Sequence, residues 1–241
     1  MLIRSMFNVA AATAVFGLVH SALASSAAKR LAGTTFGARN RNGLCRVFYI
    51  GQSLATFAIL ADYIRRQHSR ELYRIEGPLA FLMRSIQAGA LVYATSAAGQ
   101  VGLRRITGLQ SFLAWLGDGP VQPEPEAQGP ALDQEGRRHP AGPFAWSRHP
   151  LNFAPLPIFW LWPRMTTSLL AFNTTATIYL VIGSLHEEAR LRKAFNDDYE
   201  AYLNSGIPFY LPVPKQSANL ALQNNSGEER ELPGKIAGQP T

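Results

Sequence analysis

The amino-acid sequence predicts an all-α, polytopic membrane protein of about five transmembrane segments, and three observations lead to this prediction. First, residues 5–28, 47–61 and 85–103 contain no Asp, Glu, Lys or Arg, although the mean hydropathy of the whole chain is −0.03. Second, two more apolar stretches follow at 151–163 and 166–185, and about 20 mostly apolar residues suffice for a helix to cross a hydrocarbon layer of about 30 Å. Third, charged residues are concentrated between these stretches, around 29–46, 65–76, 104–105 and 117–148, and after Glu187.

The first segment, about 2–25, is expected to be a transmembrane helix. Its sequence also resembles a secretory signal, because a basic start and an apolar run lead to the small residues Ala22-Leu23-Ala24. The run is long for a signal core, and it contains Asn8 and His20. We therefore expect a retained helix, without processing after Ala24.

The rest of the N-terminal half, which we take as residues 1–116, contains two further predicted spans at about 44–63 and 79–98. Ile106–Leu116 is short and apolar, and we expect a short interfacial helix there. Residues 117–143 are rich in Pro, Gly and acidic residues and have no apolar periodicity, which predicts a solvated loop.

The C-terminal half is expected to form a helical hairpin and an amphipathic helix over residues 144–212. Its first arm, 151–163, reaches about 20 Å as a helix, and Pro155 and Pro157 each remove a backbone donor. That arm is therefore predicted to be irregular or not to span fully, which is tolerated where it faces protein or a cavity. The polar tail, 213–241, is predicted to be disordered.

Loop charge predicts the orientation, because Lys and Arg are enriched on the cytoplasmic side. The basic residues favour an N-terminus outside and a C-terminus in the cytoplasm, in the inner membrane if the source is bacterial, although the basic stretch 65–76 disagrees. The supporting residues follow the first, third and fifth segments: Lys29, Arg30, Arg39, Arg41, Arg46; Arg104, Arg105, Arg137, Arg138, Arg148; Arg190, Arg192, Lys193.

Composition argues against several other classes of protein. The net charge is +7, but the basic residues lie between apolar segments and do not form a patch with interleaved aromatics, so we expect the lipid bilayer and not nucleic acid as a partner. Cys45 is the only cysteine, which excludes an intrachain disulfide and a thiolate zinc cluster. Five scattered histidines have no ligand spacing, and no metal is expected. The sequence gives no indication of the oligomeric state.

Two adjacent acids follow the last apolar segment. On a helix, Glu188 falls on one stripe with Leu185, Leu191, Phe195, Tyr199 and Tyr202, so its carboxylate lies on the apolar face. Glu187 lies about 100° round the helix, nearer the edge of that face. A buried carboxylate needs a cationic or hydrogen-bonding partner. The alternative is that both acids are solvated and pair with Arg190 and Arg192.

Arg148-His149-Pro150 and Glu187-Glu188 bracket the hairpin of about 36 residues. Because a hairpin returns the chain to its starting side, both motifs are expected at the same membrane face. A guanidinium, an imidazole and two carboxylates there suit a zwitterionic ligand, of which S-adenosylmethionine is one.

These motifs carry a family resemblance over about residues 147–212. Arg148-His149-Pro150, an apolar hairpin with Gly183, and Glu187-Glu188 are followed by Leu191, Phe195, Tyr199, Tyr202, Pro208 and Pro212. This order resembles integral-membrane methyltransferases, among them the isoprenylcysteine carboxyl methyltransferases, phospholipid N-methyltransferases and bacterial thiol S-methyltransferases. More loosely, His20-Ser21-Ala22-Leu23-Ala24 and Arg46-Val47-Phe48-Tyr49 resemble the opening helices of the bacterial branch.

The resemblance implies an S-adenosylmethionine-dependent methyltransferase whose acceptor is small or lipophilic: a prenylcysteine-like carboxylate, a phospholipid amine or a thiol. It implies cofactor-binding roles for His149, Pro150, Leu151, Asn152, Glu187 and Glu188, and a catalytic role for Arg148, which would steady the cofactor carboxylate or the acceptor. The chain departs from the family pattern at Asn152, where a Tyr is usual, and at Asn196-Asp197, where a Gly is usual.

Two other functions fit parts of the pattern. Membrane sterol and enone reductases that use NADPH have a similar ending, but a phosphate would favour additional Arg over a Glu pair. A non-enzymatic membrane protein could also keep the fold. For single residues, Arg148 could simply extend to the membrane surface, and His149 could cap a helix. We expect His20 to be an interhelical hydrogen-bonding residue.

Overall fold

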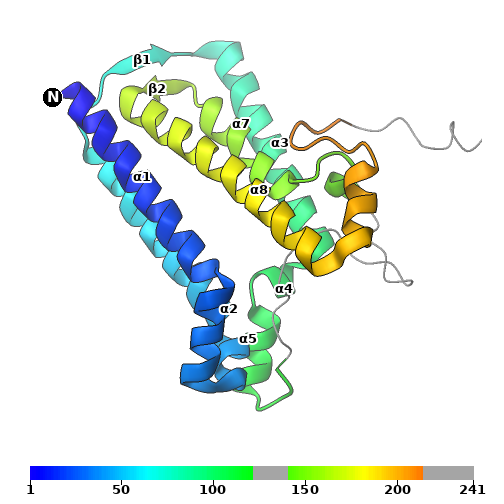
Figure 1. Cartoon of the computed structure of the whole chain (residues 1–241). Helices are drawn as coiled ribbons and strands as arrows, with labels where there is room; N and C mark the ends of the chain where they lie inside the picture. The colour runs from blue at the N-terminus through cyan, green and yellow to red at the C-terminus, as the bar shows by residue number, and fades with distance from the viewer. Residues whose placement is uncertain (122–140, 214–241) are drawn as a thin grey trace, which may run out of the picture.

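The computed structural model describes residues 1–121 and 141–213. Most of the described chain is helical (Figure 1), in agreement with the predicted fold class. The elements are, in order, α1 Leu2–Ala24, α2 Ser26–Arg66, β1 Glu71–Arg74, α3 Gly77–Val101, α4 Leu103–Ile106, α5 Leu109–Leu116, the 3-10 helix η1 Gly142–Ala145, α6 Pro150–Phe153, α7 Pro155–Trp160, β2 Arg164–Thr166 and α8 Thr167–Asn204.

Within the described residues, three helical stretches are long and apolar enough to cross a membrane: Leu2–Ala24, Ser26–Arg66 and Thr167–Phe195. They support membrane association. The predicted count of five is not confirmed, because α3 contains the polar side chains of Arg84 and Gln87 and the arm at 151–163 is divided between α6 and α7. The irregular form of that arm was predicted from its prolines.

The charged residues at 29–46 suggested a loop between two spans. That prediction is wrong, because these residues are helical. The chain turns at Gly37, which has a φ of 80° and interrupts α2. After the turn α2 packs on α5: the Trp115 indole donates to Asn40 Oδ1 at 2.9 Å. A Cβ on Gly43 would lie 2.6 Å from Trp115, so this glycine permits the close approach. The predicted short helix at 106–116 is therefore present, as α4 and α5. It packs against the part of α2 that follows Gly37.

In addition to the helices, the structure contains two short strands that were not predicted. β1 and β2 pair antiparallel, with Tyr73 opposite Met165. The connections before α3 and after α7 thereby satisfy some of each other's backbone groups. Glu71 accepts from Arg164 Nε at 2.6 Å and from Arg74; the neighbouring Arg74 and Arg164 guanidiniums lower the pKa of the Glu71 carboxyl.

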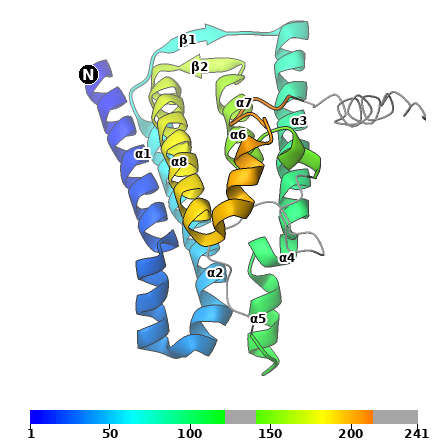
Figure 2. The same ribbon diagram turned by 45° about the vertical axis from the view of Figure 1, so that its right-hand side comes forward.

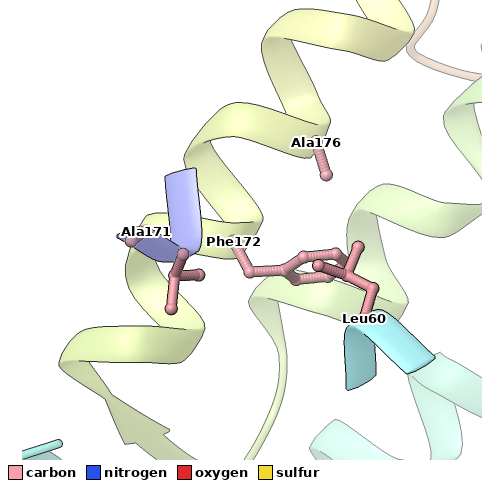
Figure 3. Packing of buried hydrophobic residues seen from close by; sticks show 5 residues of the cluster. Leu60, Ala171, Phe172 and Ala176 are labelled. Atoms are coloured by element: carbon pink, nitrogen blue, oxygen red, sulfur yellow. The ribbon is translucent and has the colours of Figure 1, made fainter. Parts of the chain in front are cut away.

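The main core lies where α1, α2 and α8 meet. Figure 3 shows Leu60 of α2 beside Phe172, with Ala171 and Ala176 on the same helix, and Val9 of α1 completes the cluster. Small residues allow the close helix approach that drives packing in a membrane. Further along, a Cβ on Gly17 would meet the Tyr179 ring at 2.7 Å, so α1 and α8 touch through a glycine.

The far end of α8 turns back on itself. Figure 2 shows its orange end turning back toward α6. The turn gathers a second buried cluster of Leu191, Tyr199, Tyr202 and Ile207. Leu191, Tyr199 and Tyr202 of the predicted apolar stripe are therefore buried, whereas Leu185, also predicted on that stripe, is 55% exposed. Most of the predicted loop, 122–140, and of the predicted tail, 214–241, lies outside the described residues. At the end of that loop, Pro143 is buried in η1 and not solvated, because η1 packs against α3, where the Tyr93 hydroxyl donates to Pro143 O at 3.2 Å.

Candidate functional site

The segment that contains Arg148 and His149 is held by the chain end that follows α8. The Arg148 amide donates to Pro208 O at 2.9 Å and the His149 amide to Phe209 O at 3.3 Å. The Val213 amide donates to Trp146 O at 3.1 Å in the same arrangement. These backbone bonds fix the segment directly before α6. Pro150 starts that helix, since proline is favoured at the first position of a helix.

Glu188 is the centre of a buried ionic cluster. Its Oε1 accepts from Arg148 Nε at 2.9 Å and lies 3.1 Å from His149 Nε2. The Glu188 side chain is 9% exposed and that of His149 is 3% exposed, so the charges are largely removed from water. A carboxylate in such a place requires its cationic partner. The prediction that Glu188 lies on a buried face and is paired is confirmed.

Glu187 has different surroundings. Its Oε2 lies 3.5 Å from His149 Nδ1, and its side chain is 24% exposed. His149 therefore stands between the two acids, with one ring nitrogen toward each. The ring is held from the other side by Phe209, whose centroid is 4.8 Å away. Glu188 is therefore enclosed by protein, whereas the carboxylate of Glu187 remains accessible to a ligand.

A chain of hydroxyl and amide groups connects the start of α6 to α8. The Asn152 amide donates to Ser184 Oγ at 2.8 Å, and the Tyr210 hydroxyl lies 2.9 Å from the same oxygen. Ser184 is fully buried. Burial raises the pKa of the Tyr210 hydroxyl, so Tyr210 stays neutral and available as a donor. Asn152 thus has a defined partner at the position where the resembling family usually has Tyr.

A cavity of about 120 Å³ opens over this cluster. Arg148, His149, Asn152 and Glu187 are its polar lining residues, and the others are apolar or aromatic. Glu188 is not part of the lining but contacts Arg148 and His149. Tyr202 donates to Phe144 O at 3.0 Å, and burial raises the pKa of its hydroxyl. The remaining lining residues are Val101, Phe144, Pro150, Leu151, Leu191 and Tyr199.

The hairpin brings all the residues that the sequence singled out to one place. Six of them line the cavity, and Glu188 holds two of these from behind. Among the described side chains, neither acid bonds to Arg190 or Arg192, and Arg192 pairs instead with Glu200 at 3.1 Å. His149 occupies the N-cap position of α6, but its side chain makes no capping hydrogen bond. Nor does Arg148 extend into water, because its side chain is 20% exposed and its guanidinium lies over the Phe209 ring.

Sequence reasoning missed three contributors: Ser184, Phe209 and Tyr210. The aromatic pair between Pro208 and Pro212 was a usable signal, because two prolines predict an extended strand-like segment with side chains on both sides. Ser184 gave no signal beyond its position one turn before Glu188. Within the described residues, no three His, Cys, Asp or Glu side chains gather where they could hold a metal ion.

Comparison with known proteins gives one partial match. A stretch of 55 residues, 23% of this chain, is 42% identical to a methanethiol S-methyltransferase of Pseudomonas deceptionensis. The stretch covers 21% of that protein, well under two thirds of its length. No family model matches the chain, and no solved structure matches it. The likeness therefore supports a membrane-methyltransferase-like protein weakly, and it leaves cofactor and acceptor open.

Proposed function

We propose that the protein transfers a methyl group from S-adenosylmethionine to a small or lipophilic acceptor at the membrane. One observation carries the proposal: Arg148, His149 and Glu187, from the two ends of the hairpin, line one cavity, with Glu188 fixing their positions. The partial likeness to a methanethiol S-methyltransferase supports the same reaction class. By the loop-charge argument the site faces the cytoplasm.

The residues present fit the amino-acid end of this cofactor. Glu187 faces the cavity and can accept the cofactor's ammonium group, while a guanidinium has five N–H donors, of which the Nε of Arg148 is taken by Glu188. The terminal nitrogens of Arg148 can hold the cofactor carboxylate. A cavity of about 120 Å³ is smaller than the roughly 300 Å³ or more of drug-sized ligand sites. The nucleoside end therefore has to bind over the open side.

When bound, S-adenosylmethionine supplies a methyl group on a sulfonium: the bond from the acceptor atom to the methyl carbon forms as the sulfonium–carbon bond breaks, and the electron pair of the broken bond stays on the cofactor sulfur. The protein itself has to position the acceptor atom against the methyl group and to exclude water from the site. Leu191, Tyr199 and Tyr202 supply the apolar wall that keeps water out. The His149 ring, fixed between the two acids, holds the Glu187 carboxylate in place.

Cofactor binding by the detergent-purified full-length chain tests the proposal. Isothermal titration with S-adenosylhomocysteine, with S-adenosylmethionine and with NADPH separates a methyltransferase from a reductase and from a non-enzymatic protein. We expect both adenosyl compounds to bind and NADPH not to. Arg148→Ala should abolish binding, whereas Arg192→Ala, a change at an exposed pair, should not. Binding of NADPH, or of none of the three, would refute the proposal.

A further inference from the structure

A second polar cluster lies between α1, α2 and α8. His20 Nδ1 is 3.0 Å from Ser53 Oγ, and His20 Nε2 hydrogen-bonds to the Tyr49 hydroxyl. Ser21 Oγ lies 2.9 Å from the Tyr179 hydroxyl of α8. The predicted interhelical role of His20 is therefore confirmed. The two N-terminal motifs that begin at His20 and Arg46 meet here, although 29 positions separate His20 from Tyr49.

One face of α8 leads from this cluster to the candidate site. Tyr179, Gly183 and Glu187 are spaced at four residues, so they lie one above the other on the helix. Tyr179 touches the second cluster and Glu187 lines the cavity. Between them, a Cβ placed on Gly183 would have no neighbouring atom within 4 Å. Gly183 is half-buried, and we call the surface of α8 between Tyr179 and Glu187 the strip at Gly183.

The strip is bordered by hydrogen-bond donors that are positively charged. Arg190 is eleven residues after Tyr179, about 20° from the same line on the helix. Its Nε is buried and has no hydrogen-bond partner among the described residues. The Arg46 guanidinium lies 5.8 Å from the Tyr49 ring centre, and its Nε donates to Ile106 O at 2.7 Å. A buried donor without a partner is costly, and an anionic ligand would satisfy it.

We propose that the open strip at Gly183, between Tyr179 and Glu187, is the acceptor site, and that Arg190 binds an anionic acceptor group there. The acceptor class is then a thiolate or a carboxylate on an apolar chain, and not an amine. This inference rests on the proposed methyl transfer, and it assigns the acceptor side of the same site. The tail of the acceptor would lie along the apolar flank of α8, where Ile182 is exposed.

Charge and space support this acceptor class. Two guanidiniums repel an ammonium group, whereas they stabilise a thiolate or carboxylate close to Glu187 and the cavity. A thiol would lose its proton to water before it binds, because thiolate is the nucleophilic form. Gly183 provides room for the apolar chain without displacing a side chain.

Acceptor binding can be measured separately from cofactor binding. We would titrate the purified full-length chain, loaded with S-adenosylhomocysteine, with hexanoate and with hexylamine, and assay turnover with hexanethiol and S-adenosylmethionine. The parent should bind hexanoate and not hexylamine. Arg190→Gln should weaken hexanoate binding at least about tenfold, since about 1.4 kcal/mol corresponds to a tenfold change. Gly183→Leu should raise the KM for hexanethiol by a similar factor, with Gly183→Ala as the milder variant. Binding of S-adenosylhomocysteine should stay unchanged in all three.

Matched controls separate this site from general damage. Arg192→Gln removes a guanidinium two residues further on that pairs with Glu200, and Gly89→Leu fills another helical glycine with open surroundings; neither should change hexanoate binding. The inference is wrong if hexylamine binds in preference, or if Arg190→Gln and Gly183→Leu behave like the controls while S-adenosylhomocysteine still binds. Failure of S-adenosylhomocysteine to bind the parent would instead remove the proposed function, and this inference with it.

Discussion

The two polar clusters of this bundle differ in where they lie and in what they are made of. The cluster around His20 sits between regular helices and consists of an imidazole and hydroxyl groups. The cluster around Glu188 sits where the chain is irregular, between α6 and the chain end after α8, and it consists of ions. Hydroxyls and imidazoles join helices at moderate cost, whereas ions inside a membrane protein are expensive and mark functional sites. The comparison assigns packing to the first cluster and ligand chemistry to the second.

Within the ionic cluster the same contrast recurs between the two acids. Glu188 is enclosed and already has two partners, whereas Glu187 is more exposed and faces the cavity. At the sequence level, the family resemblance implied a cofactor-binding role for both acids. The geometry favours Glu187 for that contact and Glu188 for holding Arg148 and His149. Substitutions at the two acids should therefore have different effects on binding and on stability.

Glu188→Gln should have the largest effect. It leaves the Arg148 guanidinium buried without its carboxylate, and removing one partner of a buried pair costs about 3–5 kcal/mol. Stability measured by denaturant titration in detergent should fall by that amount, and S-adenosylmethionine binding should weaken at least about a hundredfold. Glu200→Gln is the control, because its pair with Arg192 is exposed and worth about 0–1 kcal/mol. Equal stability losses in the two variants would mean that burial contributes nothing here.

Glu187→Gln should separate binding from stability. The Glu187 carboxylate is partly exposed and lies 3.5 Å from His149, so its removal should change the free energy of unfolding by less than about 1 kcal/mol. If it holds the cofactor's ammonium, binding should weaken about tenfold, or about 1.4 kcal/mol. Calorimetry and thermal melting of the same sample measure both quantities. Parent-like binding by this variant would assign the ammonium contact to another group.

The uncharged cluster should respond less to a comparable change. Ser53→Ala removes the hydrogen bond to His20 Nδ1, and such bonds between membrane helices average about 0.6 kcal/mol and reach about 1.7 kcal/mol. We expect a small loss of thermal stability in detergent and unchanged binding of S-adenosylhomocysteine. A loss of cofactor binding in Ser53→Ala would show that the two clusters are coupled, and the contrast drawn between them would then fail.

The sequence was sufficient to predict which residues of the candidate site come together, because their proximity follows from connectivity. Two motifs at the ends of a hairpin must return to the same level, and the period of α8 alone places Glu188 on the buried side. The sequence was not sufficient to predict that α2 is helical over 29–46, where basic residues suggested a loop. That helix is stabilised by Trp115 against Gly43, a contact between residues 72 positions apart that no local pattern contains.

The strands and the Phe209–Tyr210 segment escaped prediction for a related reason. β1 forms by pairing with β2, which lies on the other side of α3 and α7. The four residues of β1 are all exposed, with an acid at one end and a base at the other, and they carry no apolar alternation that would predict a strand. Tyr210 becomes a site residue through its bond to Ser184 of α8, so its role depends on the backward turn of that helix.

The ion pairs of β1 and β2, which Glu71 forms with Arg74 and Arg164, differ from the Glu188 cluster because they are exposed. Glu71 lies between Arg74 and Arg164, and its lowered pKa shows that the folded state favours its charged form. A carboxyl with a depressed pKa adds stability above its unfolded pKa of about 4.3, and this contribution is lost as the pH falls through the lower folded pKa. Melting temperatures of the parent and of Glu71→Gln should therefore differ slightly at pH 7 and converge at about pH 3. The difference should be the smallest of the four, since these side chains are exposed and screened by water. A difference at pH 7 as large as that of Glu188→Gln would show that exposed and buried ion pairs contribute alike in this protein, and it would remove the physical basis for treating the Glu188 cluster as the special one.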